Sequence, residues 1–335
     1  MPVPLFRKSG FLLILLVAFH FSVIQISYSS EEFSGKVSGL QIQAGELQAK
    51  GYYDKAIPII KEVLALQKAA LGGSNAEVAQ SLDLLGELHY LAGKYPEAEP
   101  FLKESLSIRM KLFGPNHTDT AKSLDHLGIL YDLLAEYAKA EKYLNDALKI
   151  RETAYGKDHP DVAETLVTLA RVQIDKDDRD KSEPLLNRAL AIQEKSLGPE
   201  HPDLTNTLNT LAWMHIDTDD FEKAEPFCRR ALEISEKAFG PEHPYVADSL
   251  NYLGRFYHSR REYDKSIEAN KRALDIREKF LGTDHPDVAL SLNDLALPYY
   301  SREEYNTAKT LLIRSLSIRE KALGPNHPYL GAVRN

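Results

Sequence analysis

The feature that most constrains this chain is a short segment that returns every 42 residues. Leu-Gly-Pro-Glu-His-Pro stands at 197–202, and related segments occur before and after it at the same interval. Because the interval is held without insertion or deletion, it indicates a tandem structural repeat. A chain of 335 residues built in this way is expected to form a stack of units without a single core. The recurring residues are Gly114, Gly156, Gly198, Gly240, Gly282 and Gly324, followed by His117, His159, His201, His243, His285 and His327.

Each unit is predicted to contain two helices. In the leading segment, apolar residues such as Leu204, Leu208 and Leu211 recur at helical spacing and indicate one buried face. Pro202-Asp203 and its copies predict the helix start, because proline needs no partner for its missing N–H and the carboxylate meets the positive end of the helix dipole. The second segment carries small residues that allow close packing, and its final glycine is expected to end the helix in the left-handed conformation. The sequence therefore predicts an all-α fold with repeats over residues 37–322, the first with a shorter leading helix.

These motifs resemble the tetratricopeptide repeat, in the pattern of Gly128, Tyr131, Tyr137 and Ala140. The 42-residue form, with Arg-Ala-Leu-x-Ile-x-Glu-Lys at 272–279, closely resembles the repeats of kinesin light chains and their bacterial relatives. The resemblance implies a right-handed α-solenoid of about seven helix pairs that binds proteins. The chain lacks the heptad segment by which kinesin light chains join their heavy chain, so no motor is implied.

Residues 1–29 lie outside the repeat and predict a secretory signal peptide. Arg7 and Lys8 precede an apolar run over 11–19, and small residues end at Ser29, after which cleavage is expected. An uncleaved membrane anchor over residues 11–26 is the alternative, although polar residues interrupt a span that needs about 20 apolar positions. Either segment would place the repeats outside the cytoplasm, in the periplasm or secreted. Residues 30–36 are expected to be a polar lead-in.

Composition narrows the functions further. The net charge is −8, which disfavours nucleic acid as a partner. The one cysteine, Cys228, excludes an internal disulfide and is expected to be a buried apolar side chain. Histidines one repeat apart lie too far from one another to share a metal ion, so they are expected to form hydrogen bonds near helix starts. No phosphate loop or catalytic motif occurs, so we expect no enzyme activity, no metal, no cofactor and no small-molecule substrate.

A peptide-binding groove is predicted on the concave face, which the leading helices line in the tetratricopeptide family. The resemblance implies that Asn209, Asn251 and Asn293 hold a peptide backbone, since an amide both donates and accepts. Trp213 is expected to lie between Arg171 and Arg255 and to favour a ligand with an apolar anchor and acidic neighbours. The alternative is that Trp213 packs against the next helix and that the arginines pair with acids. The full predicted site is Arg171, Asn209, Trp213, Asn251, Arg255, His258, Asn293 and Tyr300, and the opposite half of the groove, at Asp83, Glu87 and Asp125, is expected to be acidic.

Two departures from the repeat stand near the carboxyl end. Pro298 falls inside a leading helix and is expected to kink or destabilise it. Residues 323–335 begin a further unit without a polar capping helix, so the helix over 305–321 is expected to expose an apolar edge at Leu311, Leu312 and Leu316.

These features together predict a non-enzymatic scaffold that binds a peptide or protein segment in its concave groove. Two alternatives remain: an accessory subunit of an extracytoplasmic enzyme or secretion complex, and a membrane-tethered oligomer assembled through the uncapped edge. A membrane is expected as a partner only if the amino-terminal segment stays uncleaved.

Overall fold

The computed structural model describes residues 30–323, and all the regular secondary structure in this range is α-helix. The predicted signal segment and the start of a further unit at 324–335 lie outside the described residues. The leading helices are α1 (Ser30–Ala49), α3 (Ala76–Leu91), α5 (Thr118–Leu133), α7 (Pro160–Asp175), α9 (Leu204–Asp217), α11 (Pro244–Ser259) and α13 (Pro286–Ser301). The second helices are α2 (Tyr53–Leu71), α4 (Tyr95–Phe113), α6 (Tyr137–Tyr155), α8 (Arg179–Leu197), α10 (Phe221–Phe239), α12 (Tyr263–Leu281) and α14 (Tyr305–Leu323).

The chain divides at Gly39 into two units, and the first is described only for the start of α1. The expected lead-in is helical, because α1 already begins at Ser30. The prediction of a shortened first helix was therefore wrong. The second unit, from Leu40, contains the rest of the described helices.

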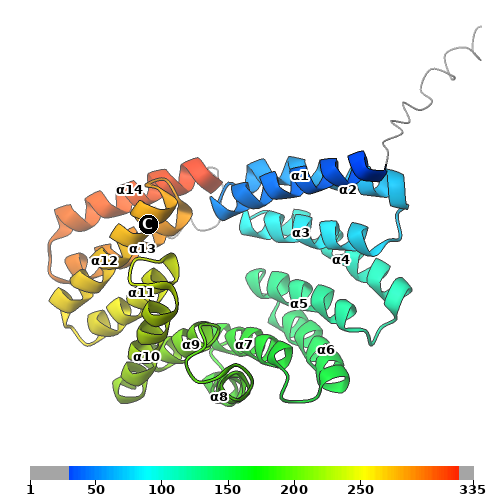
Figure 1. Ribbon diagram of the computed structural model, residues 1–335. Coiled ribbons are helices and arrows are strands. Elements are labelled where there is room, and N and C mark those ends of the chain that lie inside the picture. The colour runs from blue at the N-terminus through cyan, green and yellow to red at the C-terminus, as the bar shows by residue number, and fades with distance from the viewer. Residues whose placement is uncertain (1–29, 324–335) are drawn as a thin grey trace, which may run out of the picture. The chain divides into compact units, whose positions relative to one another are not determined.

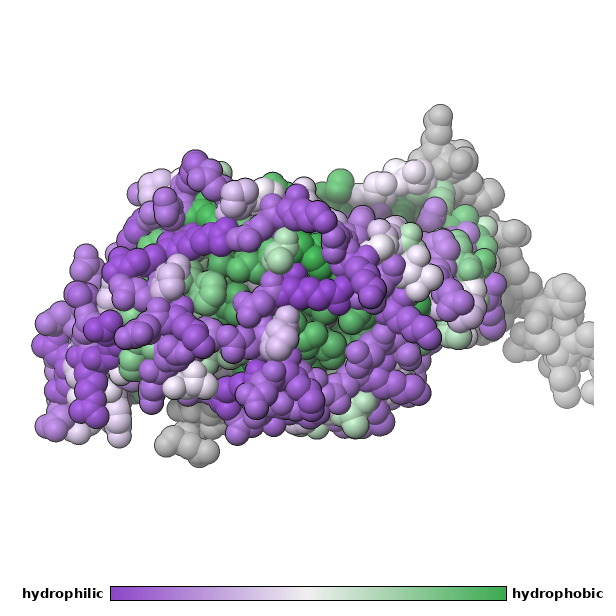
Figure 2. All heavy atoms as spheres, turned by 90° about the horizontal axis from the view of Figure 1, so that it is seen from below, coloured by the Kyte–Doolittle hydropathy of each residue, from purple (hydrophilic) through white to green (hydrophobic). Residues whose placement is uncertain are grey.

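Within the second unit, consecutive helices pack as antiparallel pairs along a curved stack. From α3 onward the odd-numbered helices line its inner side, and the even-numbered helices form the outer layer (Figure 1). Fully buried leucines such as Leu102, Leu144 and Leu186 fill the space between pairs, and each such side chain stabilises the fold by about 1.5–3 kcal/mol. Seen from the side of α7 to α10, the surface is mostly hydrophilic, with apolar atoms visible between ridges of polar side chains (Figure 2). The predicted all-α solenoid is confirmed.

Histidines begin the leading helices, as the sequence predicted. In each of five helices the Nδ1 atom accepts a hydrogen bond from the backbone N–H two residues later, for example His159 from Asp161 at 3.2 Å. An N-cap acceptor satisfies one of the helix's free N–H groups. Four of these histidines are N-cap residues, namely His117, His159, His243 and His285, whereas His201 makes the same bond to the N–H of Asp203 just before α9 begins at Leu204.

The glycines that follow the second helices have a positive φ, but not the left-handed helical conformation that the sequence suggested. Gly198 has φ 96° and ψ 156°, a region that only glycine enters at low cost. Its N–H still closes the helix by donating to the Glu194 carbonyl at 3.1 Å. The glycine prediction was thus right in residue type and wrong in conformation.

Pro298 does not interrupt α13, which continues to Ser301. A proline in a helix frees the carbonyl four residues earlier, here that of Asp294. The amide nitrogen of Asn270, a residue that is only 1% exposed, donates to this carbonyl at 3.2 Å. Asn270 stands where the two adjacent repeats have Cys228 and Leu312. The structure therefore compensates the proline with a buried amide.

The first and last pairs of the second unit contact each other. The His285 Nε2 atom lies 3.1 Å from the Ala49 carbonyl oxygen. Gly51, at φ 68°, packs under Pro286 so closely that a Cβ atom would lie 2.6 Å from the proline Cδ. This contact brings residues far apart in the sequence together at the opening of the stack.

The end of the stack is less apolar than expected. On α14, Leu311, Leu312 and Leu316 are half-buried, whereas Ile313 is 57% exposed. The described part of the chain contains no helix long and apolar enough to cross a membrane.

Candidate peptide-binding face

A buried row of polar residues runs beneath the inner face, and it controls which side chains are available there. It comprises one position in each second helix from α2 to α14: Gln67, Arg109, Arg151, Gln193, Ser235, Arg277 and Arg319. All seven side chains are at most 7% exposed. Arg109, Arg151 and Arg277 each reach the leading helix of their own pair and that of the next pair.

The contacts of Arg151 and Arg277 show this arrangement. Arg151 forms an ion pair with Asp125 of α5 at 2.7 Å and donates to Thr165 of α7 at 2.5 Å. Arg277 donates to the Asn251 Oδ1 atom at 2.6 Å and to Ser291 at 2.6 Å. Arg109 repeats the pattern with Asp83 and Ser123. The acid or amide of the leading helix is thus the internal partner of a buried arginine.

Two of the predicted asparagines consequently differ. Asn251 uses its oxygen for Arg277 and its nitrogen for Asn270, at 2.9 Å, so its amide is occupied within the fold. The equivalent second-helix residue for Asn209 is Ser235, which is too short to reach it. The Asn209 residue is only 5% exposed, and its buried Oδ1 atom has no hydrogen-bond partner among the described residues.

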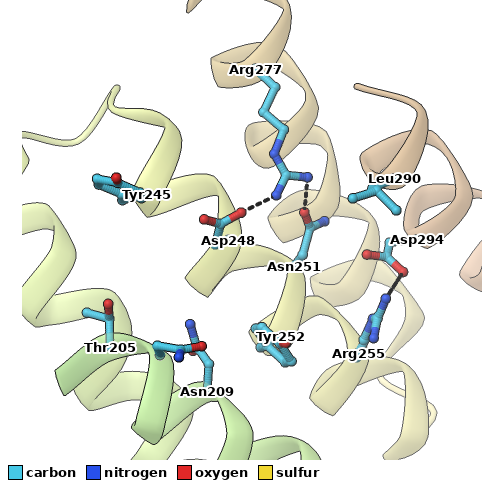
Figure 3. Close-up of a pocket in the computed structure, with 11 residues that line it drawn as sticks. Thr205, Asn209, Tyr245, Asp248, Asn251, Tyr252, Arg255, Arg277, Leu290 and Asp294 are labelled. Atoms are coloured by element: carbon cyan, nitrogen blue, oxygen red, sulfur yellow. Dashed lines mark hydrogen bonds and ion pairs between the residues drawn. The ribbon is translucent and has the colours of Figure 1, made fainter. Parts of the chain in front are cut away.

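Asn209 lines a pocket of about 410 Å³ between α9, α11, α12 and α13 (Figure 3). Burial raises the pKa of Asp248 and Asp294 on its walls. Arg277 pairs with Asp248, and Arg255 pairs with Asp294 at 2.9 Å, which balances the charge. The remaining lining residues are Thr205, Asn206, Tyr245, Asn251, Tyr252 and Leu290.

A second pocket of about 400 Å³ adjoins the first, because Thr205, Asn206 and Tyr245 line both. It contains Arg171, whose exposed side chain makes no hydrogen bond or ion pair with other residues in the described range. Its floor includes Val167, where other repeats have an acid or an amide.

A third pocket, of about 730 Å³, lies against α3, α5 and α7 and is acidic, as predicted. It is lined by seven carboxylates and by three lysine or arginine side chains. Burial raises the pKa of Asp125 to about 6 despite the nearby Arg151. Asp83 is also buried, but His126 and Arg109 lower its pKa below the usual range. This third pocket is therefore more acidic than the two adjoining pockets at Asn209 and Arg171.

The structure brings only some of the predicted site residues together. Asn209, Asn251 and Arg255 line the first pocket, and Arg171 lines the one beside it. The other four predicted residues, Trp213, His258, Asn293 and Tyr300, line neither of these two pockets.

Those four residues have the following surroundings. Trp213 is half-buried and packs against the core cluster formed by α7 to α10. The His258 Nε2 atom lies 2.9 Å from Ser301 Oγ, and burial lowers the pKa of this histidine. Tyr300 is 63% exposed, and the Asn293 Oδ1 atom is buried without a partner in the described chain. Their roles in binding stay predictions.

Other expectations concern single side chains. Cys228 is fully buried, and burial raises the pKa of its thiol to about 12, so the prediction of an apolar role is confirmed. Among residues 30–323 no group of three or more potential metal ligands comes together. Tyr245, Asp248 and Arg277 line the first pocket although the repeat pattern did not mark them as site residues. The recurrence of arginine at 109, 151, 277 and 319 was the signal that could have identified Arg277.

Comparison with known proteins agrees with the fold. A family model described as tetratricopeptide repeat matches in overlapping segments from residue 44 to residue 321. No curated protein sequence matches the chain.

Solved structures give the same result at low sequence identity. Aspartyl phosphate phosphatase F from Bacillus subtilis aligns with a TM-score of 0.64 and 16% identity, over 86% of this chain and 71% of that one. A Rap protein complexed with Competence and Sporulation Factor aligns at 0.63 and 16%, over 86% and 76%. A Podospora anserina protein with nearly identical TPR-like repeats of the kinesin light chain kind aligns at 0.50 and 24%, over 61% and 97%. The matched repeats cover most of the sequence, and the chain belongs to the tetratricopeptide repeat family.

Proposed function

We propose that this protein is a non-enzymatic scaffold that binds an extended peptide or protein segment on the inner face of α7, α9, α11 and α13. The observation that carries the proposal is the continuity of two pockets, which share Thr205, Asn206 and Tyr245. A continuous groove across several helices suits an extended chain better than a compact small molecule.

The charges of this groove favour a ligand with acidic residues beside an apolar one. Arg171 is exposed and has no ion pair with a described residue. Arg255 is 41% exposed although it pairs with Asp294. Among the residues that line the same two pockets, Tyr245 and Leu290 are 55% and 47% exposed and offer apolar contact. A carboxylate near an aromatic or aliphatic side chain would use both kinds of contact.

One structural relative supports this proposal in a general way. The Rap protein of similar fold was solved in complex with Competence and Sporulation Factor. At 16% identity the likeness concerns the fold.

The test is an array of 12-residue peptides, half of them combining one aromatic residue with acidic neighbours and half with basic neighbours. We expect the protein lacking residues 1–29 to bind the acidic set with an affinity that falls as salt rises. Arg171→Glu should weaken this binding at least tenfold. Glu77→Gln, on the exposed rim of the acidic third pocket, is the matched control and should leave it unchanged. Binding of neither set would contradict the proposed function.

We also propose that the chain is exported, on the basis of the basic and apolar layout of residues 1–29. Expression of the whole chain followed by intact-mass measurement of the exported fraction tests this. A mass lacking residues 1–29 is expected. Recovery of the full-length chain only from the cytoplasm would contradict export, and recovery from membranes would favour the anchor.

A further inference from the structure

The arginines of the buried polar row are missing from the two helix pairs whose leading helices line the adjoining pockets. Arginine occupies the row in α4, α6, α12 and α14, whereas α8 and α10 carry Gln193 and Ser235, and α2 at the start of the row carries Gln67. The leading helices of these same pairs carry Val167 and Asn209, and these residues line the two adjoining pockets. The interruption and the groove therefore coincide.

Gln193 has no equivalent acid or amide to satisfy, because its counterpart is Val167. Its oxygen accepts a hydrogen bond from Thr207 at 2.7 Å. The Ser235 hydroxyl donates to the Leu232 carbonyl of its own helix at 2.9 Å, and its oxygen lies 3.4 Å from the Ser249 hydroxyl of α11. Neither residue reaches Asn209.

Asn209 is left with a buried acceptor that nothing in the described chain satisfies. A buried polar atom without a partner is costly, and its presence in a folded protein calls for an explanation. Asn293 also has such an atom, but it does not line the groove. Asn209 faces a pocket that has room for a ligand (Figure 3).

We infer that the short side chain at position 235 leaves Asn209 without the internal arginine that occupies Asn251, and thereby keeps the Asn209 oxygen for an N–H of the bound peptide. This inference rests on the proposed function and adds to it where in the groove the peptide backbone is held. The Asn251 oxygen is not expected to accept from the peptide, because it already accepts a hydrogen bond from Arg277.

The neighbouring pair provides the design of the test. Asn251, Arg277, Ser291 and Asp248 correspond by the 42-residue repeat to Asn209, Ser235, Ser249 and Asn206. Ser235→Arg should place a guanidinium on Asn209 and Ser249, as Arg277 is placed on Asn251 and Ser291. Because a buried arginine needs a counter-charge, Asn206→Asp is added to copy Asp248. The double variant reproduces an arrangement that the fold already accommodates.

The probe is the tightest-binding peptide from the acidic array, labelled with fluorescein and titrated by fluorescence anisotropy. Asn206→Asp/Ser235→Arg should bind it at least tenfold more weakly than the native protein, with unchanged circular dichroism. Ser235→Ala is the matched control, since it alters the same buried position without reaching Asn209, and it should bind normally. Asn206→Asp alone controls for the added charge.

A second measurement identifies the donor. Each backbone N–H of the peptide is replaced in turn by N-methyl, and every peptide is titrated against the native protein and Asn209→Leu. One position should lose at least fivefold affinity for the native protein and nothing further for Asn209→Leu. This measurement does not depend on the folding of the arginine variant.

The outcomes separate the two proposals. If the native protein binds no peptide, the proposed function fails. If it binds, but the double variant binds equally well or every N-methyl effect persists in Asn209→Leu, the inference about Ser235 and Asn209 is overturned and the scaffold function stands. Loss of binding in the double variant, together with coupling of a single N-methyl position to Asn209, supports the inference.

Discussion

The substitution of Asn270 by leucine should destabilise the protein more when Pro298 is present than when it is absent. The Asn270 nitrogen donates to the Asp294 carbonyl at 3.2 Å, and its oxygen accepts from the Asn251 amide at 2.9 Å. Leucine would remove both bonds at a site that is 1% exposed. A buried carbonyl without a donor costs about 1–3 kcal/mol, and the amide of Asn251 adds a comparable amount. Asn270→Leu should therefore lower the free energy of unfolding by about 2–6 kcal/mol.

Pro298→Leu restores the backbone N–H that would bond the same carbonyl in an ordinary helix. In this background Asn270→Leu should cost about 1–3 kcal/mol less, which is the coupling energy of the double-mutant cycle. Urea unfolding followed by circular dichroism at the helical band measures all four proteins. Cys228→Leu, at the same position of the preceding pair, is the control and should show no coupling to Pro298. Equal costs of Asn270→Leu in both backgrounds, within about 0.5 kcal/mol, would refute the reasoning.

Four further outcomes are expected. Gly198→Val should cost about 1–3 kcal/mol because φ is 96° there, whereas Pro199→Ala should cost much less, and equal shifts in the urea midpoint would contradict the backbone assignment. Ala135→Gly should stabilise the protein by about 0.5–1 kcal/mol, since Ala135 has φ 56°, and a lower midpoint would disprove it. Burial and the charge of Asp175 raise the pKa of Asp132 to about 7, so the native state binds more protons than the unfolded state between about pH 4 and 7 and stability should fall as pH rises through this range. Asp132→Asn should flatten that dependence in thermal unfolding at pH 5 to 8, and an unaltered slope would show that another group is responsible. Trp213→Ala should keep the helical content but lower stability by about 2 kcal/mol because the ring is half-buried against the core, and loss of peptide binding in the folded variant would show that the ring also contacts the ligand.

Much of the fold could be predicted because the sequence signals that start, continue and end each helix act between residues close together in the chain. Helical spacing, Pro-Asp starts and glycine ends act within a few residues, and copies at a fixed interval make them unambiguous. The histidine caps belong to the same class, since the Nδ1 atom reaches only the N–H two residues on. The cap geometry at Gly198 was less predictable, because a glycine has several positive-φ regions open to it.

The candidate site was predictable only in part. Asn209 and Asn251 stand at the same position of the repeat and look alike in the sequence. They differ in the structure because Arg277 reaches one of them across a packed pair of helices while Ser235 cannot reach the other. The sequence located the inner face, but it did not show which of its amides were already occupied.

The sequence alone determined the period, the helix pairs, the caps and the face that the leading helices present, because each depends on neighbours within one repeat. Tertiary structure decided which polar groups are satisfied internally, how Asn270 compensates Pro298, and that Ala49 meets His285 across 236 positions of the chain. These outcomes require side chains of different helices to lie within hydrogen-bond distance of one another. The packing of the helices and the curvature of the stack determine those distances. The unpaired oxygen of Asn209 was also decided by the tertiary structure, because α10 carries Ser235 where α12 carries Arg277.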